Sequence, residues 1–325
     1  MKLYVPAPQA VVLWARVILC ITLLYKLFSR DFSIFGLANQ HNWFFNHYPQ
    51  AQYSISSGIN FLGIKPIVDI FSFHWIHWVL PFPSELVLSF IQRTVITLLI
   101  IILFVGGGKK KGLYILAYIL ISYLFGFIWR TNGEIDAVFM QFQVLLLFCF
   151  YQEKEPLTLF DRNIKLLQYS RKSGWFFSMI ILIFGCNYFL AGMNKLIDLS
   201  ILDWFRFDLY NVSLMINKQA ILGGDHYIIN VISFLREHPS FELINVTVAF
   251  TYLMELGAIA MFFNRRLIPF LMIYFISFHI ITSLVNILFM GNILMWLIFI
   301  PVYRSFQNVV LVWDGNCTFC KKYFR

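Results

Sequence analysis

The feature that most constrains this chain is a series of long apolar runs separated by short joins. Most runs approach the roughly 20 residues that a helix needs to cross about 30 Å of hydrocarbon. Backbone polar groups in lipid must be satisfied within the segment, so runs of this length predict helices. The sequence therefore predicts an all-α integral membrane protein with about eight transmembrane helices, over residues 11–29, 85–105, 113–129, 135–151, 174–193, 244–263, 267–289 and 291–303.

The composition agrees with a membrane location and excludes an ordinary water-soluble domain. Of 325 residues, 60% are hydrophobic and only 13% are charged, whereas a soluble domain is about half apolar and about a quarter charged. The formal net charge of +9 is not arranged as a basic stripe with interleaved aromatic residues. We therefore expect the lipid bilayer, and not a nucleic acid, as the surrounding partner.

Basic residues gather in alternate joins, which predicts the orientation of the chain. The first run lacks a small-residue cleavage site, which favours a retained helix over a removable signal peptide. The basic joins are 106–112, 152–173 and Arg265-Arg266, whereas 130–134 and 290–292 hold one basic residue between them. Because cytoplasmic loops carry an excess of Lys and Arg, both termini are predicted to be cytoplasmic, in a multi-pass protein of the cell or inner membrane.

Two ionisable residues fall inside apolar runs. Glu255 lies in TYLMELGAIAMFF, and His279 lies in IYFISFHIITSLVNILF. A charge within the membrane costs about 2.5–3.5 kcal/mol on insertion scales, so each side chain should face a partner or a wet cavity. One interpretation is a polar contact that fixes helix packing, and the other is a pocket that handles protons. The sequence leaves both open.

Lys195 follows the small residues Ala191 and Gly192 at the outer end of the fifth run. Small residues allow helices to approach closely. Burial would disfavour the ammonium form of Lys195 and leave a neutral amine that can accept a proton. The alternative is a lysine that extends to the membrane border, which its position alone favours.

The cysteines divide into two groups. Cys20, Cys149 and Cys186 lie in apolar runs, where a thiol acts as a small hydrophobe. Cys317 and Cys320 form a Cys-x-x-Cys motif after an apolar stretch and a turn, as in a strand that leads into a redox helix. Metal binding would need a second pair of ligands, so no metal is predicted.

The segment YFLAGMNKLIDLSILDWF, residues 188–205, resembles the signature of the horizontally transferred transmembrane (HTTM) domain. Vitamin K-dependent gamma-glutamyl carboxylases and many bacterial relatives share that domain, and in the carboxylases a similar Ala-Gly-x-Lys-Lys-Leu stretch precedes an Asp-Trp pair. The resemblance matches Lys195 to the lysine that deprotonates reduced vitamin K. It also matches Glu255 to an acidic residue and His279 to a Tyr-Phe-His histidine. The domain would cover residues 1–304.

This resemblance implies catalytic roles for Lys195, Glu255 and His279 and a reduced, vitamin K-like quinone as cofactor. In the carboxylases a lysine base activates the quinol, oxygen converts it into a strong base, and carbon dioxide traps the carbanion that this base creates on glutamate. The carboxylases carry an Asn-His pair where this chain reads Asn132-Gly133-Glu134. That departure argues against carboxylation of a protein substrate and leaves quinone binding as the expectation.

The tail Asp314-Gly315-x-Cys317-x-x-Cys320 is similar to the opening of DCC-type thiol-disulfide oxidoreductases. The similarity implies that residues 305–325 are the truncated start of such a domain, with Cys317 and Cys320 as redox residues and a thiol protein as partner. Two alternatives to a quinol-using enzyme remain. One is a redox carrier between a membrane quinone and thiols, and the other is a non-catalytic scaffold or transporter.

Overall fold

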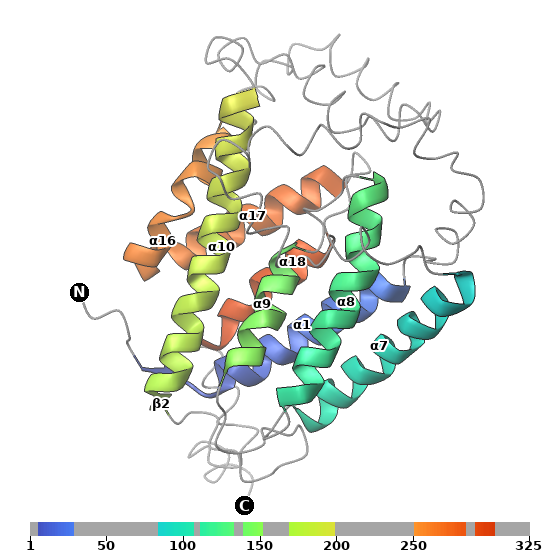
Figure 1. The fold of residues 1–325 in the computed structure, drawn as a ribbon. Helices are drawn as coiled ribbons and strands as arrows, with labels where there is room; N and C mark the ends of the chain where they lie inside the picture. The colour runs from blue at the N-terminus through green and yellow to red at the C-terminus, as the bar shows by residue number, and fades with distance from the viewer. Residues whose placement is uncertain are drawn as a thin grey trace, which may run out of the picture.

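The structure is a computed structural model that describes seven segments of the chain (Figure 1). They are residues 6–28, 84–106, 111–132, 139–151, 169–198, 250–283 and 290–302. For residues 126–132, 139, 194–198, 281–283, 290 and 301–302 only the backbone is described.

The described chain is mostly helical, as predicted. Three helices are long and apolar enough to cross a membrane, over Ala10–Phe28, Glu85–Val105 and Arg171–Met193, and the count of eight spans stays a prediction. The helices are α1 (Ala10–Phe28), α7 (Glu85–Val105), α8 (Lys111–Asn132), α9 (Phe139–Phe150), α10 (Arg171–Asp198), α16 (Ala260–Phe263), α17 (Ile268–Ser283) and α18 (Met290–Trp296), with 3-10 helices η3 (Arg265–Leu267) and η4 (Leu297–Val302). Residues 250–257 are also helical.

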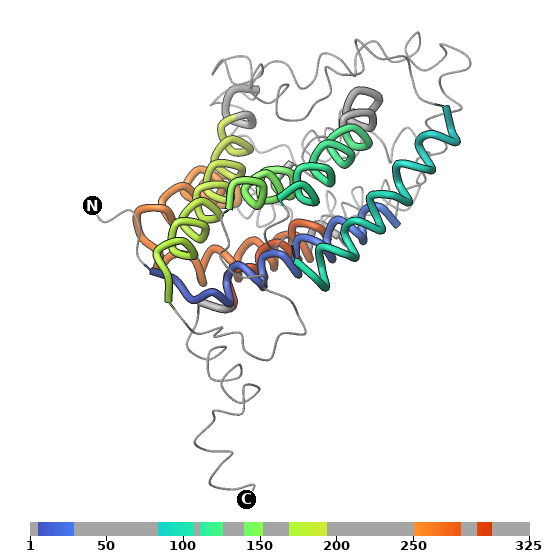
Figure 2. The backbone as a smooth tube through the Cα atoms, turned by 60° about the horizontal axis from the view of Figure 1, so that its bottom comes forward, coloured from blue at the N-terminus to red at the C-terminus, as the bar shows by residue number. Residues whose placement is uncertain are grey.

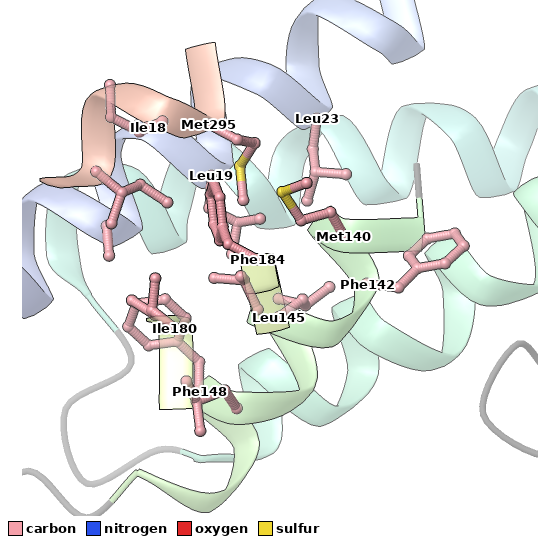
Figure 3. Packing of buried hydrophobic residues seen from close by; sticks show 14 of the residues in the cluster. Ile18, Leu19, Leu23, Met140, Phe142, Leu145, Phe148, Ile180, Phe184 and Met295 are labelled. Carbon is pink, nitrogen blue, oxygen red and sulfur yellow. The ribbon is translucent and has the colours of Figure 1, made fainter. Parts of the chain in front are cut away.

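Helix α1 contacts five other described elements. It packs against α7, α9, α10, α18 and η4, and Figure 2 shows it running beside α7 and the C-terminal helix. Side chains from α1, α9, α10 and α18 form the core between them (Figure 3). Helix α7 instead exposes large apolar side chains such as Leu86, Phe90 and Val105. Such a surface is expected of a helix that faces lipid, because lipid does not penalise exposed hydrocarbon.

A short strand pair, which the all-α expectation did not include, ties two helix starts together. Strand β1 (Ala7–Pro8) precedes α1, and β2 (Tyr169–Ser170) precedes α10. The two pair antiparallel, with Ala7 opposite Ser170 and Pro8 opposite Tyr169. Helices α1 and α10 therefore begin on the same side of the bundle.

The other described basic joins lie on that side too. Tyr114 near the start of α8 stacks on Phe148 near the end of α9, with ring centroids 5.1 Å apart. Tyr151 then contacts Phe176 in the second turn of α10, at 5.0 Å. Arg265 donates from its guanidinium to Ser178 Oγ at 3.0 Å, and burial lowers the pKa of this Arg265 guanidinium. We call this end of the bundle the basic side; its described basic residues are Lys111, Arg171, Lys172, Arg265 and Arg266.

The last apolar run changes from α-helix to 3-10 helix, and Pro301 accounts for the change. Proline has no backbone N–H, so the carbonyl of Leu297, four residues earlier, cannot receive an α-helical hydrogen bond. That carbonyl accepts a hydrogen bond from Trp14 Nε1 at 2.8 Å. The side chain of Trp14 thereby satisfies a helix carbonyl and fixes the position of α1 against η4.

Candidate functional site

The candidate site is a buried hydrogen-bonded group on three helices. Tyr188 of α10 lies with its Oη 2.8 Å from Nε2 of His279 on α17. Trp296, the last residue of α18, donates from Nε1 to the same Tyr188 Oη at 2.8 Å. Tyr188 is 6% exposed, His279 4% and Trp296 0%, so these contacts are shielded from solvent.

The chemistry of the three groups sets the direction of the hydrogen bonds. Indole N–H is only a donor, so the oxygen of Tyr188 accepts from Trp296. A phenol also has one proton to donate, and donation to His279 Nε2 satisfies both groups when the imidazole is neutral. A chain of hydrogen bonds in a low-dielectric interior polarises its members. The hydrogen bond that Tyr188 accepts from Trp296 therefore strengthens the one that Tyr188 donates to His279 Nε2.

Aromatic faces enclose this group. Phe275, one turn before His279 on α17, stacks on Tyr188 with ring centroids 3.9 Å apart and an interplanar angle of 29°. Phe275 also stacks on Trp296, at 5.4 Å and 12°, and Phe184 meets Trp296 edge-on at 5.0 Å. The surroundings therefore combine flat apolar surfaces with a few polar atoms.

Glu255 packs against the same part of α10, at Gly192, where the missing side chain leaves room for it. A Cβ atom placed on Gly192 would lie 3.1 Å from Cβ of Glu255. Seven residues earlier, a Cβ on Gly185 would lie 3.2 Å from Cα of Ile259 and 3.3 Å from the carbonyl oxygen of Ala258. Gly185 and Gly192 thus form a seam that lets residues 255–259 approach α10 closely, as small residues do between membrane helices.

The helix that carries Glu255 is interrupted just after it. Residues 250–257 are helical, 258–259 form a turn, and α16 starts at Ala260. The N–H of Ala258 bonds to the carbonyl of Glu255 at 3.1 Å, and that of Met261 to Ala258 at 3.2 Å, so bonds to the third residue replace α-helical ones. Such a stretch within a helix often marks a hinge or a functional position.

The structure brings two of the five predicted site residues into one region. His279 and Glu255 are both buried, each 4% exposed, and they meet α10 at Tyr188 and Gly192, one helical turn apart. The backbone of Lys195 belongs to α10, two turns beyond Tyr188, and its side chain lies outside the described residues. Cys317 and Cys320 also lie outside them.

Several buried polar residues escaped the sequence prediction. Tyr188 was given no role although it begins the signature segment 188–205, and Trp296 was read only as part of an apolar run. Phenol and indole groups carry no signal that separates a site from a core. Arg16 and Lys26 of α1, 1% and 7% exposed, should have been found. They satisfy the same criterion, an ionisable residue inside an apolar run, that selected Glu255 and His279.

Lys26 belongs to a second polar group. A Cβ atom on Gly291 of α18 would lie 2.5 Å from Lys26 Cε and 3.1 Å from Nε2 of Gln141. The absence of a side chain at residue 291 therefore leaves the space that Lys26 occupies. Gln141 of α9 is 0% exposed, so polar side chains of α1 and α9 both lie against Gly291 of α18. Within the described segments, no three His, Cys, Asp or Glu residues are placed to share a metal ion.

Comparisons with known proteins add no relative. No family model, no curated protein and no solved structure matches this chain. The geometry of the described residues is therefore what supports a function.

Proposed function

We propose that this chain is a multi-pass membrane enzyme that uses a reduced quinone, with a carboxylase-like HTTM domain over residues 1–304. Its reaction centre would lie where α10, α17, α18 and residues 250–257 meet. The observation that carries the proposal is the buried hydrogen-bonded group of Trp296, Tyr188 and His279, close to Glu255. Buried polar groups are costly in a membrane protein and commonly mark functional positions.

The residues present fit a quinone-type ligand. A quinol is a flat ring with oxygen atoms at its edge. The rings of Phe275, Tyr188 and Trp296 stack on one another and form a flat apolar surrounding in which a further ring would pack. The imidazole of His279 and the phenol of Tyr188 offer a donor and an acceptor for such oxygen atoms. When bound, a reduced quinone would supply an acidic hydroxyl group and two reducing electrons.

Each polar residue then has a role that its chemistry allows. His279 holds or passes a proton at Nδ1, because its Nε2 accepts from Tyr188 and this bond fixes the orientation of the ring. Tyr188 is in turn held by Trp296, which makes Tyr188 and Trp296 positioning residues. Lys195, two turns along α10, is the proposed base, and Glu255 the proposed acidic group beside Gly192. A dry surrounding strengthens each of these electrostatic contacts.

The orientation in the membrane follows from the basic side. We place that side, with the N-terminus and the joins at Lys111, Arg171 and Arg265, in the cytoplasm, because cytoplasmic loops are enriched in Lys and Arg. Lys195 and the reaction centre then lie toward the outer leaflet. The full topology proposed is eight spans with both termini cytoplasmic.

A transporter is the second candidate, and the interrupted helix at 258–259 is the observation that favours it. Substrate sites of transporters are typically formed by discontinuous membrane helices.

Coupling to a thiol module through Cys317 and Cys320 is a further part of the proposal, and replacing both by Ser tests it. Unchanged quinol turnover in that double variant would remove the thiol coupling.

The test of the enzyme proposal is quinol consumption by the purified full chain in detergent. A reduced naphthoquinone is added in air-saturated buffer, and its oxidation by dissolved oxygen is followed by absorbance above the rate without protein, with Lys195→Ala compared with Arg93→Ala. Arg93 is exposed on α7 and serves as the matched loss of a cation. We expect wild-type turnover in Arg93→Ala and loss of about 100-fold or more in Lys195→Ala, the range for a general base. Full turnover in Lys195→Ala would overturn the assignment.

A further inference from the structure

Arg16 of α1 is a buried cation that the proposed reaction does not use. Its side chain is 1% exposed, and Nε and both terminal nitrogens lie buried with no hydrogen-bond partner among the described residues. A guanidinium group has five N–H donors and stays protonated in proteins. Within a membrane bundle an unpaired charge of this kind costs several kcal/mol.

The described charged residues do not supply a counter-ion. Among the buried side chains of the described segments, Glu255 is the only carboxylate, and Arg16 and Lys26 are both cations. Helices α1 and α10 begin on the same side, at the β1–β2 pair. Arg16 lies in the second turn of α1, whereas Glu255 contacts α10 at Gly192, near the opposite end of that helix. Arg16 and Glu255 therefore lie near opposite ends of the bundle along its long axis.

The surroundings of Arg16 limit the kind of anion that could pair with it. Val12, Ala15, Leu19 and Cys20, which share its part of α1, are all buried in the hydrophobic core, and Figure 3 shows Leu19 in that core with Phe184. A multiply charged anion is strongly hydrated and would lose that hydration here. A single negative charge shared by two oxygen atoms matches the fork of a guanidinium. A hydrocarbon tail matches the apolar walls.

We propose that Arg16 binds the anionic headgroup of a lipophilic molecule, a carboxylate or a singly charged phosphate ester that carries a hydrocarbon chain. This proposal does not rest on the proposed reaction. The ligand could come from a free fatty acid or from an anionic phospholipid, which share the chemistry that Arg16 recognises.

The experiment measures the thermal unfolding midpoint of the purified, delipidated full chain in neutral detergent. Oleate is compared with oleyl alcohol, which has the same chain and no charge, and phosphatidylglycerol with phosphatidylcholine. The variants are Arg16→Met, Arg16→Lys and the control Lys26→Met, which removes the other buried cation of α1. We expect oleate or phosphatidylglycerol to raise the wild-type midpoint and their neutral counterparts to leave it unchanged.

The variants decide whether Arg16 is responsible. Arg16→Met should unfold at the wild-type temperature or above without ligand, because replacing an unpaired buried charge by an apolar side chain removes its desolvation cost. It should lose the ligand-induced shift, with the apparent affinity reduced more than about tenfold. Arg16→Lys, which keeps the charge but not the fork, should retain a smaller shift, and Lys26→Met the full one.

Three results would overturn the proposal. The first is an equal shift with the neutral lipids, and the second is a full shift in Arg16→Met. The third is a large fall in the ligand-free midpoint of Arg16→Met, or its failure to fold, since Arg16 would then have a structural partner within the chain. A shift with phosphatidylglycerol alone that depends on Arg16 supports the site and identifies a phospholipid as the source.

Discussion

Tyr188 on α10 and His279 on α17 are joined by a contact of 2.8 Å between Oη and Nε2, although 91 residues separate them in the chain. The contact exists only when α10 and α17 pack together. Without it, each helix would bury a polar group that has lost this hydrogen bond. It also involves Trp296, so three helices share one phenol oxygen. Predictions about stability and about function both follow from this contact.

The variant Tyr188→Phe should destabilise the protein. It removes the oxygen that accepts from Trp296 Nε1 and contacts His279 Nε2, with no change in ring packing against Phe275. We expect the free energy of unfolding in detergent to fall by about 1–2 kcal/mol. The control is Tyr274→Phe, which loses one contact of 2.6 Å to Thr251 Oγ1 at a half-buried position. A loss in Tyr188→Phe no larger than in the control would contradict the shared hydrogen-bonded group.

The glycine seam predicts different effects for chemically identical substitutions. Gly185→Ala would place a Cβ atom 3.2 Å from Cα of Ile259, and backbone atoms cannot move aside without shifting the helix. We expect a loss of about 1–3 kcal/mol in unfolding free energy, as in overpacked cores. Gly257→Ala meets nothing within 4 Å. It should be neutral or stabilise by up to about 1 kcal/mol, from helix propensity. Equal effects of the two substitutions would contradict close approach at Gly185.

Trp14 and Pro301 should be coupled. Trp14→Phe removes the donor to the Leu297 carbonyl, and we expect it to cost about 1 kcal/mol of unfolding free energy. Pro301→Ala restores a backbone N–H four residues after Leu297, so the cost of Trp14→Phe should fall in that background. A double-mutant cycle measures the difference. Additive effects would mean that the two residues do not act on the same carbonyl.

The basic side predicts a labelling pattern. Single cysteines are introduced in a chain whose five native cysteines are replaced by Ser. In intact cells, a membrane-impermeant maleimide should leave Arg171→Cys and Arg266→Cys unlabelled and should label Glu85→Cys, because Glu85 lies at the opposite end of α7 from the join to Lys111. All three positions are exposed. Labelling of Arg266→Cys from outside would reverse the proposed orientation.

The apolar runs and their length were enough to predict where most of the described helices lie. The run at 85–105 matches α7 residue for residue, and the run at 11–29 differs from α1 by one residue at each end. The change to 3-10 helix after Trp296 and the break at 258–259 were not predicted. Pro301 is a local signal for the first of these and was overlooked, whereas the break at 258–259 lies where the chain packs closely on Gly185 of α10, a contact that a local pattern does not contain.

The candidate site was predicted in part. Glu255 and His279 stood out because charge is rare within apolar runs, and both are buried near α10. Tyr188 and Trp296 did not stand out, since aromatic residues make up 19% of the chain and their polar atoms become significant only when helices bring them together. Arg16 was overlooked although the same rule applied to it.

The central claim is that the Tyr188, His279 and Trp296 group binds a quinone, and equilibrium binding tests it most directly. An oxidised naphthoquinone is titrated into the purified full chain, His279→Leu and Tyr274→Phe, and the dissociation constants are compared. The account predicts saturable binding to wild type and to Tyr274→Phe, and binding at least about tenfold weaker, or about 1.4 kcal/mol, in His279→Leu. Equal affinity in all three proteins, or no binding to the wild type, would contradict it.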